Sequence, residues 1–232
     1  QKNLSFPVAI YRKENGFLGI VSSRNGELYI CSKSTNKGDY AGWFKNLLYK
    51  SVNDIVAFNK YLADNKVSAI FEVIDIEHDP HIIPYMNSHI VLLDVVKNDF
   101  NDTFLTYEEL GNVAVKFGLE YKHWICSVDS FDKLQAATDE VNSWDIEGYV
   151  AVDSKGFMFK FKTDGYKFWK HIRSIRDKIA SGKDVSEFIT DKNKIIIEYM
   201  KHYLDNKGAE KLQKLSIPEL KRIIRLVDVQ FN

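Results

Sequence analysis

Alternating apolar and polar residues mark the beginning of the chain as β structure. The runs VAIYRK (8–13) and LYICSK (28–33) alternate, and the intervening GFLGIVS (16–22) is mostly apolar. Such runs are typical of strands. Asn25-Gly26 lies between two of them and is a strong signal for a hairpin turn. The pattern therefore predicts a β-hairpin over residues 8–34.

The hydrophobic period then changes. From Asp39 to Asn65 the apolar residues recur three or four positions apart, which is the spacing of an amphipathic helix. Thr106 and Glu109 have the spacing of a capping box at the start of another helix. We expect these further elements: strands at 68–76 and 89–96, helices at 106–117 and 131–144, and a second hairpin at 147–152 and 156–162.

The chain after about Tyr166 is helical, charged and poor in glycine, and Pro218 is placed to open a helix. We therefore predict an α+β fold with two parts. Residues 1–168 form a body built on antiparallel sheet, and residues 169–232 form a small helical C-terminal subdomain.

The amino-acid composition limits what can be inferred about binding partners. Lys+Arg and Asp+Glu both number 32, so the net charge is zero and gives no support for nucleic-acid binding. A basic surface has to be local. The helical tail has one candidate set, for which a solvated helix face is slightly favoured over an RNA contact: Lys207, Lys211, Lys214, Lys221, Arg222 and Arg225.

Cysteine usage and hydropathy concern the compartment. Cys31 and Cys126 have neither a pairing motif nor metal-ligand spacing, which favours a reducing intracellular compartment. No run approaches the ~18 apolar residues of a membrane span, and QKNLSFP at the beginning lacks the apolar core of a secretory signal. These features predict a cytoplasmic protein without a membrane partner.

Lys13-Glu14-Asn15-Gly16 is a Lys-x-x-Gly element at the end of an alternating strand. An unprotonated lysine there can attack a phosphorus atom, and glycine lets the backbone turn close to a nucleotide. The motif alone is weak, because Lys162-Thr163-Asp164-Gly165 also fits it. For either copy in isolation, a solvated lysine beside a turn glycine is the better interpretation.

Two glutamates stand in apolar surroundings. Glu72 lies within IFEVI, and Glu147 leads into GYVAV. A charge in an apolar strand is costly unless it is paired or faces a working surface. Glu147 is suited to hold a divalent metal near a phosphate. For Glu72, an ordinary glutamate at a strand edge or end is an equally good interpretation. For Glu147, a solvated glutamate at a helix-to-strand junction is equally good.

Phe159-Lys160-Phe161-Lys162 places both lysines on one face of a strand and both phenylalanines on the other. Neighbouring like charges favour an anion between them, such as a triphosphate. An exposed edge strand is the alternative. The run 77–81, EHDPH, has metal-ligand residue types but is a weak candidate, since no helix fixes the spacing.

The order of these motifs resembles the covalent nucleotidyltransferase superfamily. Within it, IEGYVAV followed by FKFKTDGY is similar to the phage-type ATP-dependent RNA ligases and to the adenylyltransferase domain of fungal tRNA ligases. The resemblance covers about residues 8–171. It implies an antiparallel, ATP-grasp-like fold, and it favours Lys13 over Lys162 as the nucleophile because the glutamates and the lysine pair follow only Lys13.

The resemblance also implies roles for individual residues. Lys13 forms lysyl-AMP, Glu72 contacts the ribose, Glu147 orders the metal, and Lys160 and Lys162 contact phosphates. Further implied nucleotide contacts are Glu14, Gly16, Lys33 and Tyr166. The implied cofactors are ATP with Mg²⁺ or Mn²⁺.

The implied activity is joining of a 5′-phosphate RNA end to a 3′-hydroxyl by a monomer, with tRNA among the candidate substrates. If the source is viral, the expected location is the host cytoplasm. A DNA ligase, a capping-type enzyme and a non-catalytic RNA-binding domain are the alternatives. The family usually has an aromatic-rich segment and an arginine well upstream of the nucleophile, whereas only twelve residues precede Lys13. We therefore expect either a fragment or a reduced member.

Overall fold

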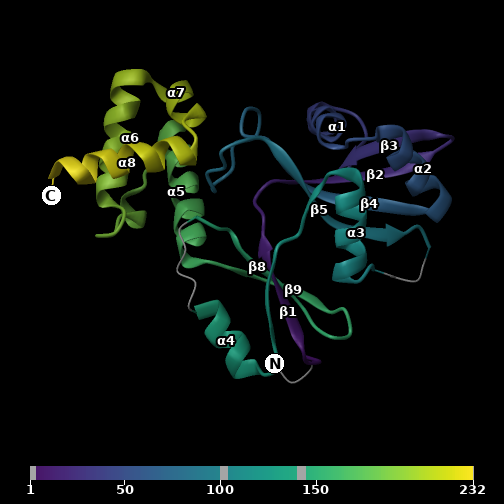
Figure 1. Ribbon diagram of the computed structural model, residues 1–232. Helices are drawn as coiled ribbons and strands as arrows, with labels where there is room; N and C mark the ends of the chain where they lie inside the picture. Colours follow the sequence, from purple (N-terminus) through teal and green to yellow (C-terminus); the bar gives the residue numbers. More distant parts are fainter. Residues whose placement is uncertain (1–3, 100–103, 140–144, 232) are drawn as a thin grey trace.

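Two β-sheets form the body of the protein. The computed structural model describes residues 4–99, 104–139 and 145–231 (Figure 1). The four-stranded sheet has the order β7-β1-β8-β9, and the five-stranded sheet has the order β3-β2-β4-β5-β6. All pairings are antiparallel except β5 with β6. The strands are β1 (Val8–Lys13), β2 (Phe17–Arg24), β3 (Glu27–Ser32), β4 (Val67–Ile74), β5 (His89–Lys97), β6 (Glu120–Tyr121), β7 (Trp124–Val128), β8 (Gly148–Val152) and β9 (Met158–Lys162).

The predicted hairpin over residues 8–34 is wrong in its first strand. β2 and β3 do form a hairpin, and Asn25 and Gly26 both have positive φ, 53° and 83°, as a tight hairpin turn requires. β1, however, pairs with β7 and β8 in the other sheet. Alternation identifies a strand but says nothing of its partner, which here lies more than 100 residues away. The second predicted hairpin is confirmed as β8 with β9.

Helices cover the outer faces of the sheets and form the C-terminal part. The stretch 39–65 is two helices, because the chain breaks at Val52 and Asp54 caps the second one by accepting a bond from the Ala57 N–H. The Thr106–Glu109 capping box is confirmed. The helices are α1 (Asp39–Ser51), α2 (Ile55–Asn65), α3 (Tyr107–Phe117), α4 (Phe131–Asp139), α5 (Asp164–Ala180), α6 (Lys194–Lys207), α7 (Ala209–Lys214) and α8 (Ile217–Phe231), with a 3₁₀ turn at Ser186–Phe188. The predicted continuation of α4 over 140–144 lies outside the described residues.

Each sheet buries one face and keeps the other for polar groups. Side chains from α1, α2 and α3, such as Phe44, Phe58 and Phe117, pack on the five-stranded sheet. Leu134 of α4 packs with Ile10 and other residues of the four-stranded sheet. Phe159 and Phe161 join this second core, so the predicted separation of the phenylalanines from Lys160 and Lys162 is confirmed.

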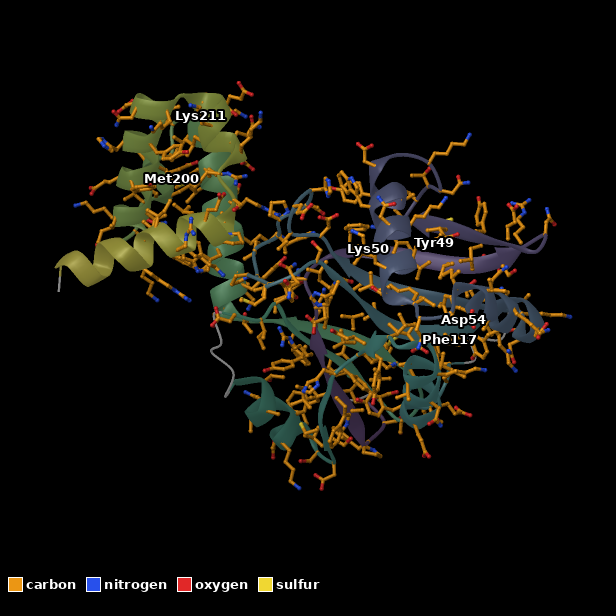
Figure 2. The ribbon with its side chains drawn as sticks, turned by 45° about the horizontal axis from the view of Figure 1, so that its top comes forward. Tyr49, Lys50, Asp54, Phe117, Met200 and Lys211 are labelled. Carbon is orange, nitrogen blue, oxygen red and sulfur yellow. The ribbon has the colours of Figure 1, made fainter. Side chains whose placement is uncertain are left out.

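The helices α5 to α8 surround a core of their own, which also receives Ile82 and Ile83 from the segment between β4 and β5. Met200 is fully buried within this group, and Lys211 lies at its outer end (Figure 2). Pro218 is the second residue of α8, one position later than predicted. The predicted domain boundary at residue 168 falls inside α5 and stays a prediction.

Cys31 and Cys126 are both free thiols. In the part of the chain that the structure describes, no helix has the length and apolarity to cross a bilayer.

Candidate active site

The Lys-x-x-Gly element that begins at Lys13 connects the two sheets. Lys13 is the last residue of β1, and Gly16 directly precedes β2. The backbone of this turn packs closely against β4, since a Cβ atom on Gly16 would lie 2.1 Å from the carbonyl oxygen of Val73. The Gly16 N–H donates to Glu72 Oε1 at 2.8 Å, which links the turn to the five-stranded sheet. The nucleophile candidate is therefore held at the junction of the sheets.

The carboxylate of Glu147 gathers the site's polar groups. Its Oε1 lies 2.8 Å from Lys162 Nζ, and its Oε2 lies 3.2 Å from Lys13 Nζ. Residue Gly148 pairs with both Lys13 and Lys162 across the strands, so these two lysines share the inner face of the four-stranded sheet. Only 4% of the Glu147 side chain is exposed. Two cations thus offset the cost of burying this charge.

Glu72 presents a second carboxylate from the five-stranded sheet. Burial raises the pKa of Glu72, and the nearby Lys13 ammonium and the Gly16 N–H oppose that rise. The Glu147 charge also raises the pKa of Glu72, and the His81 charge lowers it. The structure therefore brings Lys13, Glu72, Glu147 and Lys162 together, although the two glutamates are 75 positions apart in sequence.

The lysine pair of β9 is less symmetrical than the sequence suggests. Burial alone would lower the pKa of Lys162, but its contact with Glu147 outweighs burial, and the net shift is upward. Its ammonium also lies 4.5 Å from the centroid of the Tyr166 ring, which is buried. Lys160 is exposed on the same strand face and has no ion-pair partner among the described residues. It remains available to an anion.

Two predicted residues, Glu14 and Lys33, and the glycine of the second Lys-x-x-Gly copy stand in other surroundings. The Glu14 side chain points to Arg12 Nε at 3.2 Å and to the Tyr85 hydroxyl at 2.8 Å, while its carbonyl accepts a bond from Lys13 Nζ. Lys33 is exposed and lines a 430 Å³ hollow beside β3, where no ion pair joins it to any described residue. Gly165, from the second Lys-x-x-Gly copy, is buried in the first turn of α5 and forms no nucleotide-facing turn.

Asn15 and Tyr85 complete the site and were missed from the sequence. The Asn15 amide donates to Glu147 Oε2 at 2.7 Å, and its carbonyl accepts the N–H groups of Ile82 and Ile83. The Tyr85 hydroxyl accepts the Asn15 N–H at 2.8 Å. Burial raises the pKa of Tyr85, so this hydroxyl stays protonated and donates to Glu14. Since the partners of Asn15 are mainly distant backbone groups, no sequence signal marks it.

Replacing Asn15 with alanine is expected to lower the free energy of unfolding by about 1–3 kcal/mol, because two buried N–H groups and Glu147 lose their partner. Asn36→Ala is the matched control. Asn36 is exposed and has no side-chain hydrogen bond within the described residues, so its change should stay within about 0.5 kcal/mol. Urea unfolding followed by circular dichroism measures both. Equal stability of the two variants would contradict the bridging role of Asn15.

The described residues contain no group of three or more His, Cys, Asp or Glu side chains placed to hold a metal. In the run 77–81, the predicted weak metal candidate, His81 Nε2 lies 2.9 Å from Asp79 Oδ2, and His78 pairs instead with Asp75. A metal enclosed by protein ligands therefore does not fit. Mg²⁺ that keeps several waters and shares substrate phosphates needs only one or two carboxylates, and the Glu147 carboxylate fits that requirement.

A family model described as RNA ligase matches residues 1–166 of this chain. An archaeal ATP-dependent RNA ligase has a similar fold with a TM-score of 0.62, 13% identity, and coverage of 96% of this chain and 61% of that chain. The Naegleria gruberi RNA ligase with PPi has a TM-score of 0.58, 14% identity, and coverage of 74% and 53%.

A putative ATP-dependent DNA ligase from Aquifex aeolicus is also similar, with a TM-score of 0.57, 15% identity, and coverage of 98% and 63%. At these identities the likeness concerns the fold. This chain spans between about half and two thirds of the length of these neighbours. One mutant of the Naegleria ligase was determined with ATP and Mn.

Proposed function

Because the chain belongs to the RNA ligase family, we propose that it is an ATP-dependent RNA ligase in which Lys13 carries AMP. The observation that supports this most is the convergence of Lys13, Lys162 and Asn15 on the buried Glu147 carboxylate. A solvated lysine beside a turn glycine would have no reason to be held in this way. We also propose that residues 1–168 are the adenylyltransferase domain.

The proposed first step forms a phosphoramidate bond. The unprotonated Lys13 amine attacks the α-phosphorus of ATP, the bond to the β-phosphate oxygen breaks, and pyrophosphate leaves. Lys160 and Lys162 face the same side of the sheet as Lys13, where they can stabilise the phosphate charge. Glu72 is placed to accept hydrogen bonds from the ribose hydroxyls.

Two transfers complete the proposed reaction. The 5′-phosphate of an RNA end attacks the phosphorus of lysyl-AMP and releases the Lys13 amine. A 3′-hydroxyl then attacks the 5′-phosphorus, forms the phosphodiester and releases AMP. A divalent cation near Glu147, Mg²⁺ or Mn²⁺, would supply charge neutralisation of the phosphates.

The proposal extends to substrate and setting. We infer that RNA with 5′-phosphate and 3′-hydroxyl ends is the polymer, with tRNA among its candidates. The chain is proposed to act as a monomer in the cytoplasm, since its two free cysteines suit a reducing compartment.

Labelling with α-labelled nucleotides tests the function directly. In Mg²⁺, the protein is expected to become covalently labelled by ATP and not by GTP, and EDTA should prevent labelling. The adenylylated protein should then join broken RNA and leave nicked DNA unsealed. Labelling by GTP would instead assign a capping-type enzyme, and sealing of DNA alone would assign a DNA ligase. RNA binding without any labelling would mark a non-catalytic domain.

A further inference from the structure

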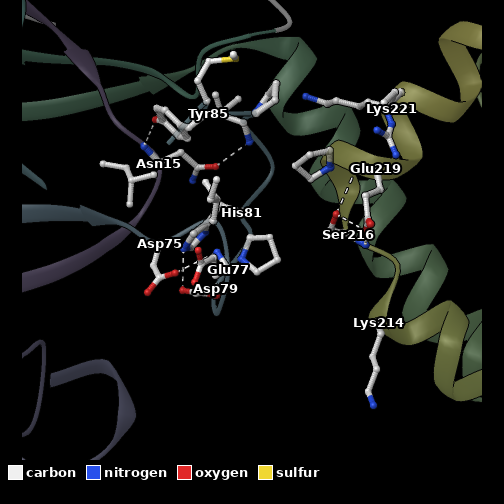
Figure 3. Close-up of a pocket in the computed structure, with 18 of the residues that line it drawn as sticks. Asn15, Asp75, Glu77, Asp79, His81, Tyr85, Lys214, Ser216, Glu219 and Lys221 are labelled. Carbon is white, nitrogen blue, oxygen red and sulfur yellow. Dashed lines mark hydrogen bonds and ion pairs between the residues drawn. The ribbon is translucent and has the colours of Figure 1, made fainter. Parts of the chain in front are cut away.

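A large cleft separates the segment after β4 from the start of α8. Its volume is about 1010 Å³, and Figure 3 shows its two walls facing each other across open space. One wall is the segment that includes Asp75, Glu77 and Asp79. The other is formed by the end of α7 and the first turns of α8. Asn15 and His81 lie on the same side as these carboxylates (Figure 3).

The two walls carry opposite charge. The helical wall contributes four cations, Lys214, Lys221, Arg222 and Arg225, and one carboxylate, Glu219, which accepts bonds from Ser216. The opposite wall contributes the carboxylates of Asp75, Glu77 and Asp79. Arg225 contacts Asp145, and Lys214 is paired with Glu210. Arg222 is exposed and has no ion-pair partner among the described residues. One strong phosphate-binding group is thus available on this wall.

Lys221 adds a second kind of cation to the same wall. It is only 5% exposed and lies over the Trp169 ring at 5.4 Å. Burial lowers the pKa of Lys221 to about 8, against the opposing effect of Asp145. An approaching anion would favour its charged form.

A ribose–phosphate strand matches this pairing of walls. Its phosphates carry negative charge for the helical wall, and its 2′-hydroxyls can donate hydrogen bonds to carboxylates on the other side. Exposed apolar side chains of the segment after β4, Pro84 and Met86, offer packing surface for bases. DNA lacks the 2′-hydroxyl and gains nothing from the acidic wall.

The cleft borders the nucleophile site through Asn15. This residue lines the cleft, is only 4% exposed, and donates to the same Glu147 oxygen that contacts Lys13. His81 lines the cleft as well, and its charge acts on Glu72. A strand seated between the walls would therefore be separated by Asn15 from the Glu147 carboxylate of the proposed adenylylation site.

We propose that this cleft binds the ribose–phosphate backbone of the RNA strand that reacts at Lys13, with Arg222 on a phosphate and Glu77 on a ribose hydroxyl. The inference rests on the proposed function, because it assigns the second substrate of the same site. The two parts then have separate roles. The sheets form lysyl-AMP at Lys13, and the cleft holds the 5′-phosphate strand that takes the AMP.

Binding of a short 5′-phosphorylated RNA strand, followed by fluorescence anisotropy with the full chain, tests the cleft. Arg222→Glu is expected to weaken RNA binding about tenfold. It should reduce the slope of log affinity against log salt by roughly 0.7, the value for one phosphate on a single strand. Lys211→Glu is the matched control, because Lys211 is an exposed cation of the same helical group outside the cleft. Its effect should stay below about twofold.

Glu77→Ala examines the other wall. It is expected to reduce the preference for RNA over a DNA strand of the same sequence by about threefold. Self-labelling with ATP should be unchanged in Lys211→Glu, whose side chain lies outside the cleft. Unchanged RNA affinity in Arg222→Glu, or an equal loss of affinity in Lys211→Glu, would overturn the proposal that the cleft binds RNA. Equal losses of RNA and DNA binding in Glu77→Ala would also overturn it. A wild-type chain that never self-labels would refute the proposed function alone, since the affinities still decide on the cleft.

Discussion

Replacing Lys13 with alanine is expected to reduce covalent labelling by α-labelled ATP to background. The ammonium of Lys13 lies 3.2 Å from Glu147 Oε2, and Gly148 pairs with both Lys13 and Lys162, so these two lysines share a sheet face. Lys13 begins the turn that ends at Gly16, whose backbone is packed against Val73 of the neighbouring strand β4. Gel detection of the labelled protein in Mg²⁺, with mapping of the adduct to a peptide, measures the effect.

Lys155→Ala is the control for this experiment. Lys155 is exposed in the turn between β8 and β9, and its loss should leave labelling intact. Thermal unfolding should confirm that Lys13→Ala is folded, since Glu147 keeps Lys162 and Asn15 as partners. Labelling that persists in Lys13→Ala and disappears in Lys162→Ala would move the nucleophile to the second Lys-x-x-Gly copy.

Replacing Gly16 with alanine is expected to damage both stability and self-labelling. The new methyl group would lie 2.1 Å from the Val73 carbonyl oxygen, which is backbone and cannot rotate away. Overpacking of this kind costs about 1–3 kcal/mol. Relief of the clash also displaces the Gly16 N–H from Glu72, and with it the end of β1. Urea unfolding and the initial rate of labelling report the two effects.

Gly42→Ala has the opposite expectation and is the matched control. Gly42 is exposed in α1, and nothing lies within 4 Å of an added Cβ atom. Alanine there should stabilise the helix by about 0.5–1 kcal/mol and leave labelling unchanged. If Gly16→Ala behaved like Gly42→Ala, the tight packing of the nucleophile turn would be refuted.

Local features of the fold could be predicted from the sequence because their causes are local. The Asn25-Gly26 turn needs positive φ, the Thr106 cap needs only Glu109, and the alternation in β9 separates lysine from phenylalanine. Strand partners depend on distant segments, so the position of β1 between β7 and β8 was missed. β6 and β7 themselves were also not predicted, since two and five residues give little periodicity.

The residues of the candidate site likewise fall into those that local sequence predicts and those that depend on distant segments. Lys13, Glu72, Glu147 and Lys162 are ionisable residues in recognisable surroundings, and the structure brings them together. Asn15 was not predicted because its value lies in bridging Glu147 to the backbone of Ile82 and Ile83. The anion expected between the β9 lysines has a counterpart within the protein, since Glu147 neutralises Lys162. Their roles in catalysis stay a prediction.

The central position of β1 in its sheet determines when the newly made chain can assemble its active centre. β1 is synthesised well before the strands that flank it, since Val8 pairs with Val128 and Lys13 pairs with Gly148. At about 5–20 residues per second, synthesis reaches those partners roughly 6 to 27 seconds later. Throughout that interval the strand has no sheet to join, and Lys13 lacks Glu147 and Lys162. A nascent or truncated chain therefore has no assembled centre with which to consume ATP.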